Sequence, residues 1–136
     1  MQVEYTKMFI DGSWCDSDSG ETFENINAAN GETIARIPLA GHSDVDRAVQ
    51  AAARAQREWA RWTPAERGRV LRRAAQLLRE NVEQIARLES LDTGRPIQET
   101  PEADVESGAA CLEYFGGIAA GIEGEYGDLS RAFYYT

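Results

Sequence analysis

The chain has 136 residues, the length of one ordinary domain, and its 43% hydrophobic and 27% charged residues are typical of a folded soluble protein. Its 23 acidic residues outnumber 14 basic ones, which gives a net charge of −9. A protein that binds the phosphate backbone of a nucleic acid usually carries a positive net charge. The sequence shows no apolar run of membrane-spanning length and no secretory signal at its start. We therefore expect no nucleic-acid partner, no membrane association and a cytoplasmic location.

Residues that carry common catalytic chemistry are scarce. Cys15 and Cys111 are too far apart in sequence to suggest a disulfide framework, so we expect a reducing compartment. The single histidine, His42, excludes a His-rich metal site, and the sequence has no Gly-Lys-Ser/Thr phosphate loop. We expect Cys15 to lie in a polar loop and Cys111 to be a small buried hydrophobic residue, neither of them a nucleophile.

The first 40 residues predict two β-hairpins. Residues 7–10 are apolar and extended, and Asp11-Gly12 is a strong turn dipeptide. Residues 22–26 and 33–37 alternate polar and apolar side chains around a turn at residues 29–32, as half-buried strands do.

From residue 42 onward the apolar residues recur at helical spacing. Ser43 is the expected N-cap of the first helix. Thr63-Pro64 with Glu66 predicts a capping box at the start of the second. This second pattern runs to Gly94, and Asn81 leaves open whether it is one long helix or two.

A last helix is predicted from Thr100, with Gly124 and Gly127 ending it. The glycines from Gly116 onward do not follow the spacing of a dinucleotide loop, so we assign them to close helix packing and a helix stop. Residues 132–136 are β-prone, and no partner strand follows them. We therefore expect the sequence to be part of a longer chain.

Short motifs spread over nearly the whole chain resemble, in order, the N-terminal part of an aldehyde dehydrogenase. They are Phe9-Ile10-Asp11-Gly12-Ser13-Trp14, Asn27 with Gly31, residues 44–49, Glu66-Arg67, residues 88–96 and Tyr134-Tyr135-Thr136. Residues 108–117, preceded by Glu99-Thr100, resemble the betaine aldehyde dehydrogenase branch in particular. Ala28 departs from the proline that the family usually has after the asparagine, which is expected to loosen that turn.

The resemblance implies an α/β fold of the aldehyde dehydrogenase type. This segment would supply the N-terminal β-hairpins and three or four amphipathic helices, and would end at the start of an oligomerisation strand. Residues 1–132 would be the incomplete N-terminal part of the NAD(P)-binding (coenzyme) domain, and residues 133–136 would begin the oligomerisation strand. The intact enzyme is expected to be a homo-oligomer, either a dimer or a tetramer.

The resemblance also implies a chemistry. In the family a cysteine thiolate attacks the aldehyde, hydride passes to NAD or NADP, and a glutamate assists hydrolysis of the thioester. The nucleophile, the base and the nucleotide site are expected beyond Thr136, so we assign no catalytic or cofactor-binding residue within the chain and expect the chain alone to be inactive. The implied reaction is oxidation of an aldehyde, betaine aldehyde to glycine betaine on the subfamily resemblance.

Asp92 needs a positive partner because it lies at the C-terminal end of a predicted helix, where the helix dipole disfavours negative charge. The candidates are Arg95, a cap on the Thr93-Gly94 turn, and a bound cation. The resemblance implies a structural potassium ion held by Asp92 and the backbone oxygens of Asn25 and Ile26, a set of hard ligands that suits such an ion. Asn25 stands where the family commonly has threonine or serine.

Further interpretations stay open. The basic stretch from Arg54 to Arg79 could bind an anion, but we expect it to face the acidic stretch from Glu89 to Asp128 or to form a solvated surface. The chain could also be a truncated, non-catalytic module that joins full-length aldehyde dehydrogenase subunits by strand addition at residues 133–136. An independent helical domain is the third possibility.

Overall fold

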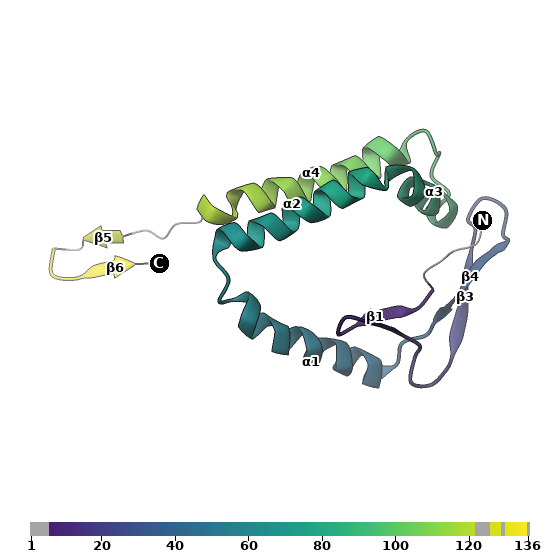
Figure 1. Cartoon of the computed structure of the whole chain (residues 1–136), viewed down its shortest axis with the longest axis horizontal. Helices are drawn as coiled ribbons and strands as arrows, with labels where there is room; N and C mark the ends of the chain where they lie inside the picture. Colours follow the sequence, from purple (N-terminus) through teal and green to yellow (C-terminus); the bar gives the residue numbers. More distant parts are fainter. Residues whose placement is uncertain (1–5, 122–125, 129, 136) are drawn as a thin grey trace.

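The computed structural model describes residues 6–121, 126–128 and 130–135, and it contains two N-terminal hairpins, a set of helices and a third hairpin (Figure 1). Strands β1 (Met8–Ile10) and β2 (Ser13–Cys15) pair antiparallel. Asp11 and Gly12 join them with φ of 53° and 78°, the two positive values that a tight type I′ turn requires. The predicted Asp-Gly hairpin is therefore confirmed.

The second hairpin consists of β3 (Thr22–Ile26) and β4 (Thr33–Pro38), also antiparallel, with an irregular register between Asn25 and Ile26. The motif of Asn27 with Gly31 forms its turn. The Asn27 side-chain oxygen accepts a hydrogen bond from the Ala29 N–H at 2.9 Å, and the Gly31 N–H donates to the Asn27 carbonyl at 2.8 Å. Gly31 has φ of 76°, so glycine is the natural residue there.

The helical part comprises α1 (His42–Trp59), α2 (Pro64–Glu80), α3 (Val82–Thr93) and α4 (Ser107–Ile118). The π-helical segment η1 (Pro101–Glu106) precedes α4, and the 3-10 segment η2 (Ala119–Gly121) follows it. Helices α2 and α4 lie side by side (Figure 1).

The start of α2 agrees with the sequence, and the start of α1 does not. The last helical stretch begins near the predicted Thr100, but as the π-helical segment η1, and α4 itself starts only at Ser107. Thr63 and Glu66 form the predicted capping box of α2: the Thr63 N–H donates to Glu66 Oε2 at 2.8 Å. The predicted cap Ser43 is wrong, because Gly41 is the N-cap and the Asp44 side chain accepts the Gly41 N–H at 3.0 Å. The helical conformation is interrupted at Asn81, so the pattern from Pro64 to Thr93 forms two helices rather than one.

The end of the last helix differs from the prediction. Helix α4 stops at Ile118, and Gly127 lies in strand β5 (Tyr126–Asp128), while Gly124 lies outside the described residues. Glycine weakens helices, and the several glycines after residue 115 explain the early stop. Strand β5 pairs with β6 (Phe133–Tyr135), so the final strand has a partner that precedes it in the sequence, which the sequence pattern did not indicate.

The described residues bury few large apolar side chains. The buried apolar residues are Ala51, Ala75, Ala86, Val105 and Ala109. Val45 and Val49 on the apolar face of α1 are 54% and 62% exposed. The chain exposes 10293 Å², against about 7,000 Å² for a compact protein of this mass. These apolar faces are thus left uncovered by the chain itself. Within the described residues, no helix combines the length and apolar character that crossing a membrane requires.

Candidate functional site

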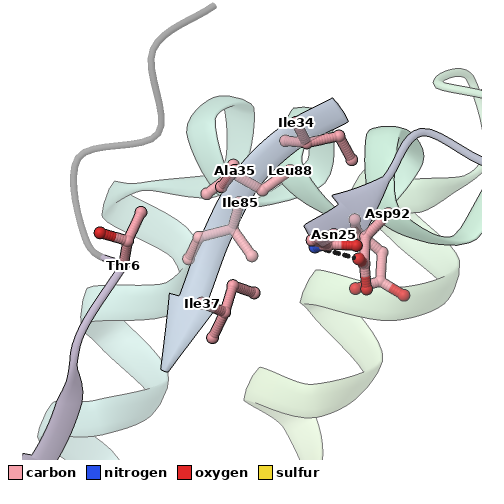
Figure 2. A pocket seen from close by; sticks show the side chains of 9 residues that line it. Thr6, Asn25, Ile34, Ala35, Ile37, Ile85, Leu88 and Asp92 are labelled. Carbon is pink, nitrogen blue, oxygen red and sulfur yellow. Dashed lines mark hydrogen bonds between the residues drawn. The ribbon is translucent and has the colours of Figure 1, made fainter. Parts of the chain in front are cut away.

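The second hairpin meets the end of helix α3 around a pocket of about 280 Å³ (Figure 2). Its walls are mainly apolar and come from β4 and α3, with a polar edge at Asn25, Glu89 and Asp92. The apolar lining residues are Ile34, Ala35, Ile37, Ile85 and Leu88. The pocket therefore lies where two elements far apart in sequence are brought together.

A hydrogen bond joins the two sides of this pocket at its polar edge. The Asn25 amide nitrogen donates to Asp92 Oδ1 at 2.7 Å, the contact drawn as a dashed line in Figure 2. Asn25 is half-buried on β3, and Asp92 is exposed on the last turn of α3, which contains no basic residue.

The helix end itself is shaped by Gly94. This residue has φ of 76° and its N–H donates to the Ser90 carbonyl at 3.1 Å, the left-handed cap that commonly ends a helix. A Cβ at Gly94 would lie 3.1 Å from the Ala28 Cβ, so the hairpin turn rests directly on the cap. The strand and the turn of the hairpin both contact the end of α3.

The structure thus brings together two of the predicted ligand residues, Asn25 and Asp92, and places Ile26 next to them at the register irregularity, 41% exposed. Among the described residues, no group of three or more His, Cys, Asp or Glu is placed to hold a metal. The potassium ion stays a prediction. Sequence reasoning expected only the Asn25 backbone to contribute and missed its side chain; the departure from threonine or serine was the available signal.

The other candidate partners of Asp92 are engaged elsewhere. The Arg95 guanidinium bonds the Asp104 carboxylate and lies 3.9 Å from Glu99. The Thr93 hydroxyl donates to the Glu89 carbonyl at 2.8 Å and accepts the Arg95 N–H at 3.3 Å. Arg95 is therefore not the partner of Asp92 in this structure.

A second joint, which the sequence reasoning did not single out, centres on Asp44. This carboxylate is only 2% exposed and accepts hydrogen bonds from Arg47 Nη2 at 2.8 Å and from the Asp18 N–H at 3.2 Å. Arg47 also bonds Asp18 Oδ1 at 2.7 Å, and a hydrogen bond from Ser43 holds the pKa of Asp18 below its usual value. The joint ties the loop after β2 to the start of α1, which gives the motif at residues 44–49 a structural role.

The basic and acidic stretches face each other in part, as predicted. Arg79 on α2 reaches Glu106 at 2.7 Å and Glu113 at 3.0 Å. The hydrogen bonds from Arg79 lower the pKa of Glu106, because they favour its charged form. These ion pairs cross from α2 to the η1 and α4 segments, so the two stretches meet at Arg79.

The two cysteines behave differently from each other. Cys15 is the last residue of strand β2, so the expectation of a loop position was wrong; it is half-buried, with Arg47 Nη2 at 3.9 Å from its sulfur. Cys111 is exposed, so the prediction that it is buried was wrong. Ala109 and Gly116 lie seven positions apart on the buried face of α4, and Cys111, two residues after Ala109, points away from that face.

Comparison with known proteins gives consistent results. Residues 14–135 match the aldehyde dehydrogenase family. Among solved structures, PnpE from Pseudomonas sp. WBC-3 is 42% identical, with a TM-score of 0.89, over 96% of this chain and 26% of its own.

Two further structures share the fold. The gamma-glutamyl-gamma-aminobutyraldehyde dehydrogenase of Burkholderia cenocepacia J2315 is 36% identical with a TM-score of 0.89. The match covers 93% of this chain and 26% of the length of that protein. A point mutant of betaine aldehyde dehydrogenase from Staphylococcus aureus, in complex with NAD+, is 35% identical with a TM-score of 0.86 over 93% of this chain and 26% of its own. The chain thus spans about a quarter of the length of these proteins.

Proposed function

The chain belongs to the aldehyde dehydrogenase family, and on that premise we propose that it is the N-terminal part of an NAD(P)-dependent enzyme that oxidises an aldehyde to the carboxylic acid. The observation that carries this proposal is the family match over residues 14–135 together with the agreement in fold. A structure of PnpE was solved with nicotinamide adenine dinucleotide bound, which supports the same cofactor class here. Betaine aldehyde is the substrate we propose, on the resemblance of residues 108–117.

The chain's own part in this enzyme is structural. We assign residues 1–132 to the N-terminal part of the coenzyme domain and residues 133–136 to the start of the oligomerisation strand of a dimer or tetramer. The exposed apolar face of α1 supports this role, since it offers surface for further packing, and residues 133–135 form a strand, as an oligomerisation strand would. When bound, the dinucleotide supplies the hydride acceptor, and the residues described here would hold the framework around it.

A potassium ion near Asp92 is part of the same proposal. The Asp92 carboxylate and the backbone oxygens of Asn25 and Ile26 would hold it, and hard oxygen ligands suit such a cation. The irregular register between Asn25 and Ile26 supports this, because an irregularity in the ladder turns backbone groups away from the neighbouring strand.

The test begins with the intact mass of the protein from its source. A mass several times 15.0 kDa is expected, and the protein of that length should form NADH or NADPH with an aldehyde, betaine aldehyde first. The 136-residue chain alone should give no signal above a blank without protein. Absence of turnover by the longer protein with every aldehyde tried, or turnover by the chain alone, would contradict the proposal.

The alternative, a non-catalytic module, predicts a different mass. A source protein of 15.0 kDa that co-purifies with full-length aldehyde dehydrogenase subunits would favour strand addition at the β5–β6 hairpin.

A further inference from the structure

We propose that the Asn25 side chain is a latch that fastens the β3–β4 hairpin to the end of α3 through Asp92, so that this joint persists without a bound cation. The inference rests on contacts within this chain and does not depend on the proposed reaction.

The end of α3 concentrates negative charge. Asp92 lies on the last turn, where the helix dipole already places a partial negative charge, and Glu89 shares the rim of the same pocket. Arg95, the nearest cation in sequence, is paired with Asp104 and lies near Glu99. The contact between the hairpin and the Asp92 carboxylate therefore comes from a group other than Arg95.

The Asn25 amide makes this contact. Its nitrogen lies 2.7 Å from Asp92 Oδ1, at the short end of the range for hydrogen bonds to a charged acceptor. An amide carries no charge, so its partial burial beside the apolar pocket costs less than burial of an ion would. The contact also spans the two sides of the pocket, since Asn25 belongs to β3 and Asp92 to α3.

The length of the side chain gives the latch its specificity. The amide nitrogen of asparagine is one covalent bond further from Cβ than the hydroxyl of threonine or serine. A hydroxyl at position 25 would leave a gap in front of Asp92, which a cation could fill. Asparagine spans that distance from the hairpin side, so the potassium ion proposed above would be a second bridge rather than a necessary one. The identity of residue 25 therefore decides whether the hairpin and the helix need an ion to stay joined.

The test is hydrogen–deuterium exchange of the protein at its natural length, in potassium chloride and in tetramethylammonium chloride of equal ionic strength. For the unmodified protein, exchange at residues 22–26 and 89–94 should be the same in both salts. Asn25→Ala should speed exchange there in tetramethylammonium by about twofold to tenfold, the range for one lost hydrogen bond. Asn25→Asp should become dependent on potassium, because it sets two carboxylates against each other.

Glu24→Gln is the matched control. Glu24 is the preceding residue on the same strand, and its carboxylate pairs with Arg36 inside the hairpin at 2.7 Å, so this variant should exchange at residues 89–94 like the unmodified protein. Two results would overturn the latch: faster exchange of the unmodified protein when potassium is replaced, or no effect of Asn25→Ala in tetramethylammonium. Neither readout involves aldehyde oxidation, so a failure of the proposed reaction would be recognised separately.

Discussion

The crossing of α2 and α4 leaves no room for a side chain at Gly116. A Cβ there would lie 2.8 Å from the Gly68 carbonyl oxygen, 3.1 Å from Arg72 Cγ and 3.2 Å from Leu71 Cβ. The Gly116 carbonyl in turn accepts a hydrogen bond from Arg72 Nη1 at 2.7 Å. Gly116→Ala therefore forces the two helices apart, whereas Gly117→Ala, one residue further on the same helix, meets no atom within 4 Å.

The magnitude follows from comparing these two variants. Each replaces a helical glycine by alanine, which by itself stabilises the helix by about 1 kcal/mol, so this contribution cancels in the difference. What remains is the overpacking at Gly116, about 1–3 kcal/mol. Loss of the Arg72 hydrogen bond would add about 1 kcal/mol. We expect Gly116→Ala to open the α2–α4 pair more easily than Gly117→Ala by at least about 2 kcal/mol.

Hydrogen exchange of the α2 and α4 amides measures this difference, because it reports the free energy of local opening even when the whole protein does not unfold in one step. A difference of about 2 kcal/mol corresponds to roughly 30-fold faster exchange in Gly116→Ala. Equal exchange in the two variants would refute the reasoning, since it would mean that the Gly68–Gly116 contact is not tight in the folded protein.

Two further predictions concern the helix starts. Asp44→Asn should lower the free energy of unfolding of the α1 region by about 1.5 kcal/mol, because it removes the charge from the buried acceptor of Arg47, whose guanidinium is 42% exposed and keeps its pair with Asp18; thermal unfolding checks this, and an unchanged midpoint would contradict it. Glu66 has a lowered pKa, chiefly because the Thr63 backbone N–H bonds its carboxylate, so its contribution is fully present above the ordinary pKa of 4.5 and is lost as pH falls through the lowered value. The unmodified protein should exceed Glu66→Gln in thermal stability at neutral pH and lose that advantage in acid, and a constant difference across this range would count against the capping role.

The features that the sequence predicted correctly are local ones. The Asp11-Gly12 turn and the capping box of Thr63 and Glu66 involve residues within three positions of each other. Short-range sterics and hydrogen bonds decide such elements, so residue types alone indicate them. The family resemblance added the fold class, which the matched structures confirm.

The errors arose where a remote partner competes with a local preference. Ser43 is a good cap by residue type, but the Asp44 carboxylate, held by Arg47 and the Asp18 backbone, takes the Gly41 N–H and starts α1 earlier. Cys111 lies near an apolar pattern, but the face of α4 that meets α2 is set by the close approach at Gly116.

The sequence by itself determined the two N-terminal hairpins, the approximate helices and the family. Only the tertiary structure decided that Asn25 and Asp92, 67 positions apart, share a hydrogen bond, and that the backbones at Gly68 and Gly116 touch. The physical reason is that turns and caps are fixed by neighbours along the chain. The partner of a polar side chain or of a bare glycine backbone depends on how whole elements pack, and no local pattern records that packing.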